Sequence, residues 1–103
     1  MGDSEREFSG KITKIKLKSS EKVTEVLDQF GKAQKMKADY LKKNEEMMTS
    51  AASDLEKVER DMAKNEGLSA ESQKRLNDEI TAARNQIRQK YDELRSRISD
   101  HLE

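Results

Sequence analysis

Few side chains in this sequence have the types and spacing that catalysis requires. His101 is the only histidine, and the chain contains no cysteine, which excludes a thiolate nucleophile and a disulfide framework. The acidic pairs Glu45-Glu46 and Asp92-Glu93 each join neighbours that point in different directions on a helix, so neither forms a carboxylate dyad. The sequence holds no zinc, calcium or glycine-rich phosphate motif. We therefore expect a protein that is not an enzyme and that uses no catalytic residue, metal or cofactor.

The composition favours long helices over a globular core. Charged residues make up 41% of the chain and hydrophobic residues 32%, which suits either disorder or helices with a narrow apolar seam. Proline is absent, and most polar residues are good helix formers, which favours the helices. No apolar run approaches the roughly 18 residues of a membrane span, and the N-terminal segment lacks the apolar core of a signal peptide. We expect a cytoplasmic, intracellular protein of the all-α class.

The stretch around Gly67 marks the point where one long helix ends and another begins. Gly67 suits a left-handed residue after a helix C-terminus, and Ser69 suits the N-cap of the next helix. A turn this short sends the second helix back along the first. We predict a helix over about 20–65, capped by Ser19 or Ser20, a turn at 66–69 and a helix over about 70–101.

The apolar residues of these two helices come level when the chain is folded at the turn. The stripe of the second helix is Leu76, Ile80, Ala83, Ile87, Tyr91, Leu94, Ile98 and Leu102. When the two helices are aligned in this way, apolar residues lie opposite each other in pairs: Val58 with Leu76, Leu55 with Ile80, Ala51 with Ala83, Met48 with Ile87 and Leu41 with Leu94. Residues 19–103 therefore predict an antiparallel helical hairpin of two long, coiled-coil-like helices.

Residues 1–18 precede this hairpin and carry two conflicting patterns. Phe8, Ile12 and Ile15 have helical spacing, but an alternating segment follows them, as in a strand. We expect an N-terminal arm that is mobile or folds as a short third helix. The beginning of the first helix then overhangs the second, so either this arm or a second copy of the chain must cover its apolar residues. We favour a homodimer, with the interface residues Val23, Val26, Leu27, Phe30, Ala33 and Tyr40.

We expect a protein–protein interaction module, such as an adaptor, an assembly factor or a small chaperone, that binds itself or another helical protein through this overhang. The alternative is binding of nucleic acid or an anionic membrane, because residues 11–43 carry ten lysines and four acids, whereas residues 44–79 carry ten acids and five bases. A basic docking surface at the open end of the hairpin would consist of Lys32, Lys35, Lys42, Lys43, Lys90, Arg95 and Arg97. A solvated face balanced by nearby acids is the structural explanation of the same charges.

Overall fold

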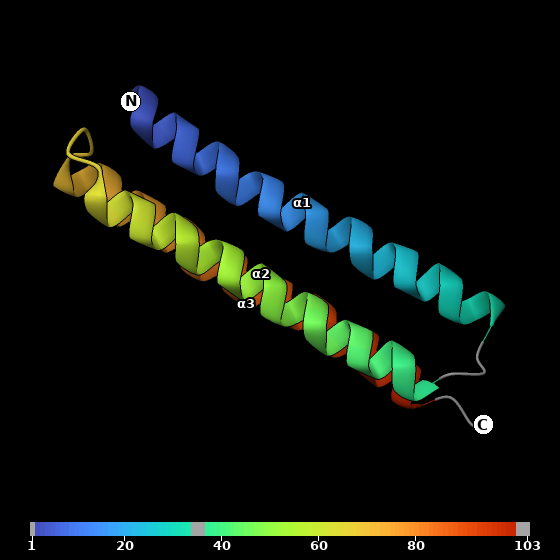
Figure 1. Ribbon diagram of the computed structural model, residues 1–103. Coiled ribbons are helices and arrows are strands. Elements are labelled where there is room, and N and C mark those ends of the chain that lie inside the picture. Colours follow the sequence, from blue (N-terminus) through green and yellow to red (C-terminus); the bar gives the residue numbers. More distant parts are fainter. Residues whose placement is uncertain (1, 34–36, 101–103) are drawn as a thin grey trace.

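The computed structural model describes residues 2–33 and 37–100, and within these ranges the chain forms three helices and no strand. Helix α1 spans Asp3–Lys32, α2 spans Lys37–Lys64 and α3 spans Ala70–Ser99. The prediction of an all-α protein is confirmed. The helices lie side by side and make a rod of 53 × 16 × 15 Å (Figure 1).

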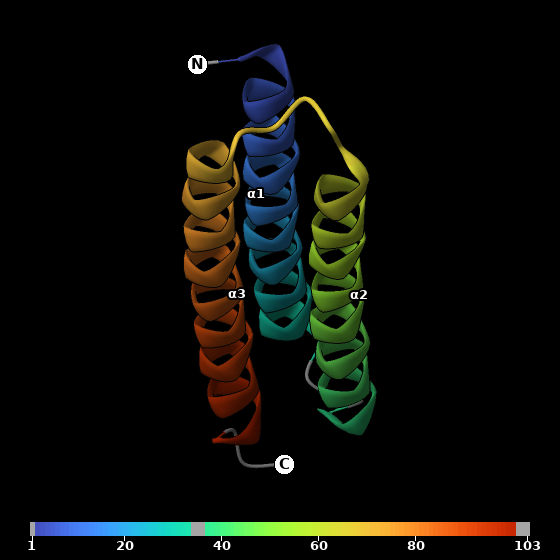
Figure 2. The same cartoon turned by 90° about the vertical axis from the view of Figure 1, so that its left-hand side faces the viewer.

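The three helices pack around one common core. The turn that follows α2 sends α3 back along it, and α1 runs parallel to α3 and antiparallel to α2 (Figure 1). Each helix packs against both of the others, and Figure 2 shows α1 set behind the pair formed by α2 and α3. The architecture is therefore a three-helix bundle with short connections.

The predicted division into an arm at 1–18 and a long helix over about 20–65 is wrong. One helix covers both the arm and the beginning of the predicted long helix, so Ser19 and Ser20 lie inside α1 instead of capping a helix. Ala33, at the end of α1, has extended backbone with φ −148° and ψ 96°. The reversal that follows brings the rings of Phe30 and Tyr40 to a centroid distance of 5.2 Å, at an angle of 79°.

Burial of apolar side chains explains why the chain reverses after α1. A continuous helix would leave Val26 and Phe30 overhanging, whereas the reversal buries both, together with Phe8 and Ile12, against α2 and α3. Each such burial contributes about 1.5–3 kcal/mol. Interruption of a helix removes up to about four backbone hydrogen bonds, each of which contributes about 1 kcal/mol in net terms. Burial of the four side chains therefore outweighs this loss.

The core runs the length of the rod. All seven described residues of the stripe predicted for the second helix are buried in α3. Leu102, the last residue of that stripe, lies outside the described residues. The apolar core consists of Phe8, Ile12, Val26 and Phe30 from α1, Met47, Ala51, Leu55, Val58 and Met62 from α2, and Leu76, Ile80, Ala83, Ile87, Tyr91, Leu94 and Ile98 from α3.

The turn between α2 and α3 needs glycine for space. The described glycines have no positive φ, so the predicted left-handed conformation at Gly67 is wrong. A Cβ at Gly67 would lie 3.0 Å from Asn65 Oδ1 and 3.1 Å from Ser4 Oγ, closer than side chains normally pack. Ser69 caps α3, as predicted, by accepting a 3.1 Å hydrogen bond from the Ser72 N–H. The turn therefore lies against the first turn of α1.

Candidate functional site

The structure divides the predicted interface residues into buried and accessible groups. Val26 and Phe30 are 1% and 2% exposed inside the core, so a partner does not reach them in this fold. Val23, Leu27 and Tyr40 are partly buried, and Ala33 is exposed. The chain itself thus covers the centre of the predicted overhang and leaves its margins accessible.

Two of these marginal residues line a shallow groove between α1 and α3, which we call the α1–α3 groove. Val23 and Leu27 of α1 and Leu94 of α3 provide its apolar floor. The remaining lining residues are polar: Ser20, Thr24, Lys90, Glu93 and Arg97. Lys90 Nζ reaches across to Ser20 Oγ. The groove therefore brings together residues that the sequence assigned to two different surfaces, the apolar interface and the basic docking surface.

Leu17 lies on the outer side of α1 and does not line this groove. It is the one large apolar side chain that is exposed among the described residues, at 58%. Leu17 precedes Thr24 by seven positions, so these two exposed side chains share the outer side of α1. Val23 and Leu27 follow Leu17 by six and ten positions, which turns them away from Leu17 and toward α3.

The predicted basic docking surface does not form one patch. Lys32 ends α1 and pairs with Asp28 at 3.2 Å, while Lys43 Nζ lies 3.5 Å from Gln29 Oε1. On α3, Arg95 faces α2, whereas Lys90 and Arg97 face α1. Lys42 is exposed near the start of α2, and Lys35 lies outside the described residues. The six described residues of this surface are therefore spread over three helices and face more than one side of the rod.

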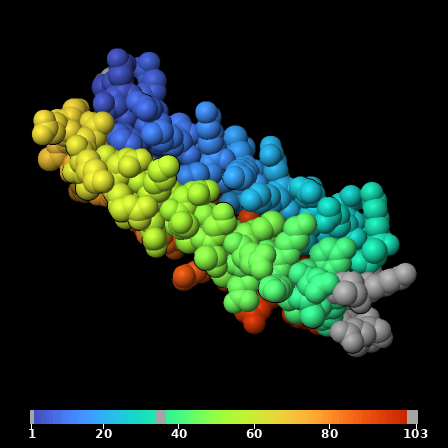
Figure 3. Space-filling model, viewed as in Figure 1, coloured from blue at the N-terminus to red at the C-terminus, as the bar shows by residue number. Residues whose placement is uncertain are grey.

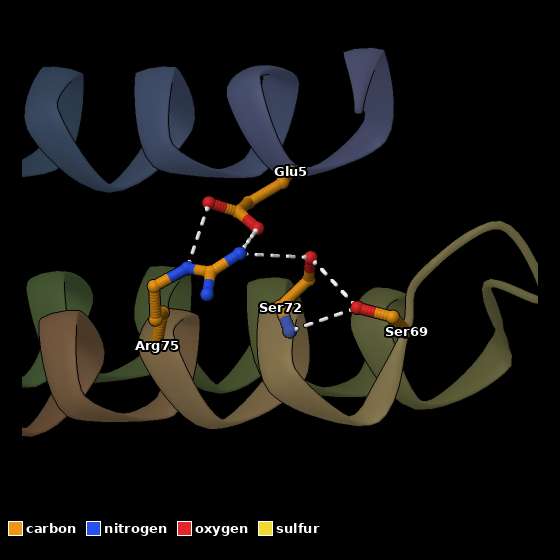
Figure 4. A network of polar contacts seen from close by, with 4 residues as sticks. All are labelled: Glu5, Ser69, Ser72 and Arg75. Carbon is orange, nitrogen blue, oxygen red and sulfur yellow. Dashed lines mark hydrogen bonds and ion pairs between the residues drawn. The ribbon is translucent and has the colours of Figure 1, made fainter. Parts of the chain in front are cut away.

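A polar network ties the first turn of α1 to the first turns of α3 (Figure 4). The Glu5 carboxylate, 4% exposed, accepts hydrogen bonds from Arg75 Nη2 at 2.7 Å and from Arg75 Nε at 3.3 Å. Arg75 Nη2 also lies 3.4 Å from Ser72 Oγ, which accepts a 3.0 Å bond from the Ser69 hydroxyl. The hydrogen bond from Arg75 lowers the pKa of Glu5, and the same bond raises the pKa of Arg75. The network therefore stabilises a charged pair at one end of the rod.

A second polar layer lies inside the core, where α2 and α3 meet. Asn44, 3% exposed, donates a 3.1 Å hydrogen bond from Nδ2 to the Tyr91 carbonyl. Asn44 Oδ1 and Tyr91 Oη are buried and meet no partner at hydrogen-bonding geometry. Burial raises the pKa of Tyr91, an effect that the nearby Ser19 partly opposes. A buried asparagine of this kind fixes the register of packed helices at some cost in stability.

The described residues form grooves and ion pairs along the surface of the rod. The described part of the chain contains no cluster of three or more His, Cys, Asp or Glu residues that could hold a metal ion. Among the helices described, none combines the length and apolar character needed to cross a membrane. Comparison with models of known protein families, with curated proteins and with solved structures gives no match.

Proposed function

We propose that this chain is a non-catalytic helical interaction module that binds an amphipathic helix of another protein in the α1–α3 groove. The observation that supports the proposal is the apolar floor of the α1–α3 groove, which the partly buried Val23 and Leu27 of α1 form together with Leu94 of α3. Helix-in-groove recognition uses apolar anchors that repeat at three and four residues, and this floor offers a contact for such an apolar face.

The charges beside the groove indicate the chemistry of the partner. Lys90 and Arg97 border its α3 side, with Glu93 between them, so the rim is cationic in balance. Complementary rim charges orient a partner and raise its association rate. We therefore propose a partner helix whose apolar face is flanked by acidic residues. Because the apolar floor of the groove consists of three side chains, the contact belongs to the weak, transient class of interfaces.

A peptide titration tests this proposal. A fluorescently labelled helical peptide with leucines on one face and glutamates beside them should bind the intact chain. The matched peptide with lysines in place of the glutamates should bind at least about tenfold more weakly, a difference of roughly 1.4 kcal/mol. Equal binding of the two peptides, or no binding of either, would contradict the proposal.

Variants of the chain locate the binding site. Leu27→Asp removes an apolar contact from the groove floor and adds a charge that repels the acidic peptide, so it should weaken binding of the peptide. Asn85→Asp adds the same charge at an exposed position on the outer side of α3 and serves as the matched control. Loss of binding in the control as well would show that net charge, and not the groove, determines the affinity.

A further inference from the structure

A second groove runs between α2 and α3 and is lined by residues of these two helices alone; we call it the α2–α3 groove. Near the middle of the rod, Met48 and Leu55 of α2 and Ile87 of α3 form its apolar floor. Thr49 and Ala52 of α2 also line it, and their small side chains let another helix approach closely. Toward the end of the rod that lies opposite the α2–α3 turn, the groove continues past Leu41. This groove is separate from the α1–α3 groove.

The two rims of the α2–α3 groove carry opposite charges. Glu45, Glu56 and Glu59 lie on the α2 side, and Arg84, Arg88 and Arg95 lie on the α3 side. One pair, Arg84 with Glu59, forms an ion pair across the groove within the chain. At Lys42 on α2 and Asp92 on α3 the charges are reversed, so here α2 carries the positive charge and α3 the negative charge. Each rim thus complements the other along the described length of the groove.

The ion pair between Arg84 and Glu59 shows how far apart along the rod two residues on α2 and α3 can lie and still bring their charged groups together. Arg88 and Glu56 have the same offset to within one residue, because Arg88 lies four positions after Arg84 and Glu56 three positions before Glu59. A surface whose two halves complement each other in this way can pair with itself, since a twofold axis places the same patch on both subunits.

We propose that the α2–α3 groove binds a second copy of this chain, with a twofold axis parallel to the rod. This axis places α2 of one protomer antiparallel to α3 of its partner, so the acidic rim of each copy meets the basic rim of the other. A twofold axis perpendicular to the rod would instead place α2 on α2 and bring acids opposite acids. The charges therefore select the first arrangement and the four-helix contact that it produces.

One long face of the rod is large enough for an interface of ordinary size. One long face measures 53 Å by 16 Å, which is comparable to the roughly 800 Å² per partner that a standard interface buries. The floor is apolar but offers no fully exposed large side chain, because Leu17, the one such residue among those described, lies on α1. The dimer should therefore depend on its rim charges and weaken as salt rises.

Sedimentation equilibrium on the intact chain tests the proposal. The wild-type protein should approach twice the mass of one chain as its concentration rises. Glu56→Arg alone and Arg88→Glu alone should each raise the dimer Kd at least about tenfold, because like charges then face each other. Glu46→Arg is the matched control: it makes the same change on α2, but toward α1, and should leave the Kd unchanged.

Mixing the two single variants separates contacts between chains from contacts within a chain. In a mixed dimer the arginine introduced by Glu56→Arg would face the glutamate introduced by Arg88→Glu. The native Arg88 of the first variant would face the native Glu56 of the second, so both pairs regain opposite charges. The mixture should therefore dimerise with a Kd close to that of the wild type, while circular dichroism shows that each variant is folded. A monomeric wild-type chain at high concentration, variants that dimerise normally, or a mixture that stays monomeric would each overturn the proposal.

Discussion

The carboxylate of Glu5 lies 2.7 Å from the guanidinium of Arg75, so the beginning of α1 is held to the beginning of α3. The same end of the rod contains the turn at Gly67, which approaches Ser4 of α1. This end is therefore built from contacts between segments that are far apart in the sequence.

Removal of the Glu5 charge should change how stability depends on pH. The hydrogen bond from Arg75 lowers the pKa of Glu5 below its ordinary value of 4.5. A carboxyl group with a lowered folded-state pKa stabilises the fold at pH values above its unfolded-state pKa, and this contribution is lost as the pH falls through the folded-state pKa. Glu5→Gln should therefore lower Tm at neutral pH and reduce the loss of Tm in acid.

Thermal unfolding followed by circular dichroism between neutral and acidic pH measures this effect. Glu7→Gln is the control, because Glu7 is an exposed residue that makes only a 3.7 Å ion pair with Lys11 in its own helix. Identical pH profiles for Glu5→Gln and the wild type would contradict the assigned role of the Glu5–Arg75 pair.

The glycines of α1 and of the turn should respond in opposite ways to replacement by alanine. A Cβ at Gly10, inside α1, meets no atom within 4 Å, so Gly10→Ala should raise the free energy of unfolding by about 1 kcal/mol through helix propensity. Gly67→Ala places its Cβ close to Ser4 and Asn65, which should cancel or reverse any gain. Urea denaturation compares the two variants, and an equal gain in both would contradict the close approach at Gly67.

The hydroxyl group of Tyr91 should be dispensable for folding. It is buried and has no partner at standard hydrogen-bonding geometry, although the Ser19 side chain lies nearby, so Tyr91→Phe should raise the free energy of unfolding by up to about 1 kcal/mol. Leu94→Ala, at a neighbouring buried position, should lower it by about 2–5 kcal/mol and shows that the assay detects core changes. A Tyr91→Phe variant that loses stability would show that the hydroxyl has a partner in solution.

Two adjacent residues of α1 should differ sharply in their tolerance of a charge. Val26 is 1% exposed, so Val26→Asp should destabilise the bundle by about 3 kcal/mol or more, because the carboxylate loses its hydration. Leu27 borders the α1–α3 groove, where an aspartate reaches water, so Leu27→Asp should cost about 1 kcal/mol or less. Chemical denaturation measures both changes. Similar costs at the two positions would contradict the observed orientation of α1.

The regular stripe of α3 was predictable because its apolar residues repeat at intervals of three and four without interruption. The course of α1 was not. Its core face includes the polar residues Glu5 and Ser19, both buried, which hide the stripe that Phe8 and Val26 share. Gly31 lies two residues before Ala33, but an isolated glycine is tolerated inside a helix, and residues 33–36 contain neither proline nor glycine, so the local signal for the reversal after α1 is weak. Tertiary burial, which a local pattern does not report, decides where this helix ends.

The candidate sites, too, could be predicted only as far as local sequence patterns reach. Val23 and Leu27 stood out as apolar residues that the hairpin left uncovered, and the structure does leave them partly accessible. These two residues lie beside Lys90 and Arg97 because α1 runs parallel to α3, and no local sequence pattern indicates that arrangement.

The odd number of helices determines how this rod would carry force. The described chain starts at one end of the rod, where the blue residues lie in Figure 3, and finishes at the other (Figure 1), with α1 and α3 pointing the same way and α2 running in the opposite direction. Tension applied between these two ends pulls the helices past one another in shear. Interhelical contacts loaded in shear must break together, whereas contacts that are peeled apart break one by one, so the bundle should resist stretching along its length better than bending open at one end.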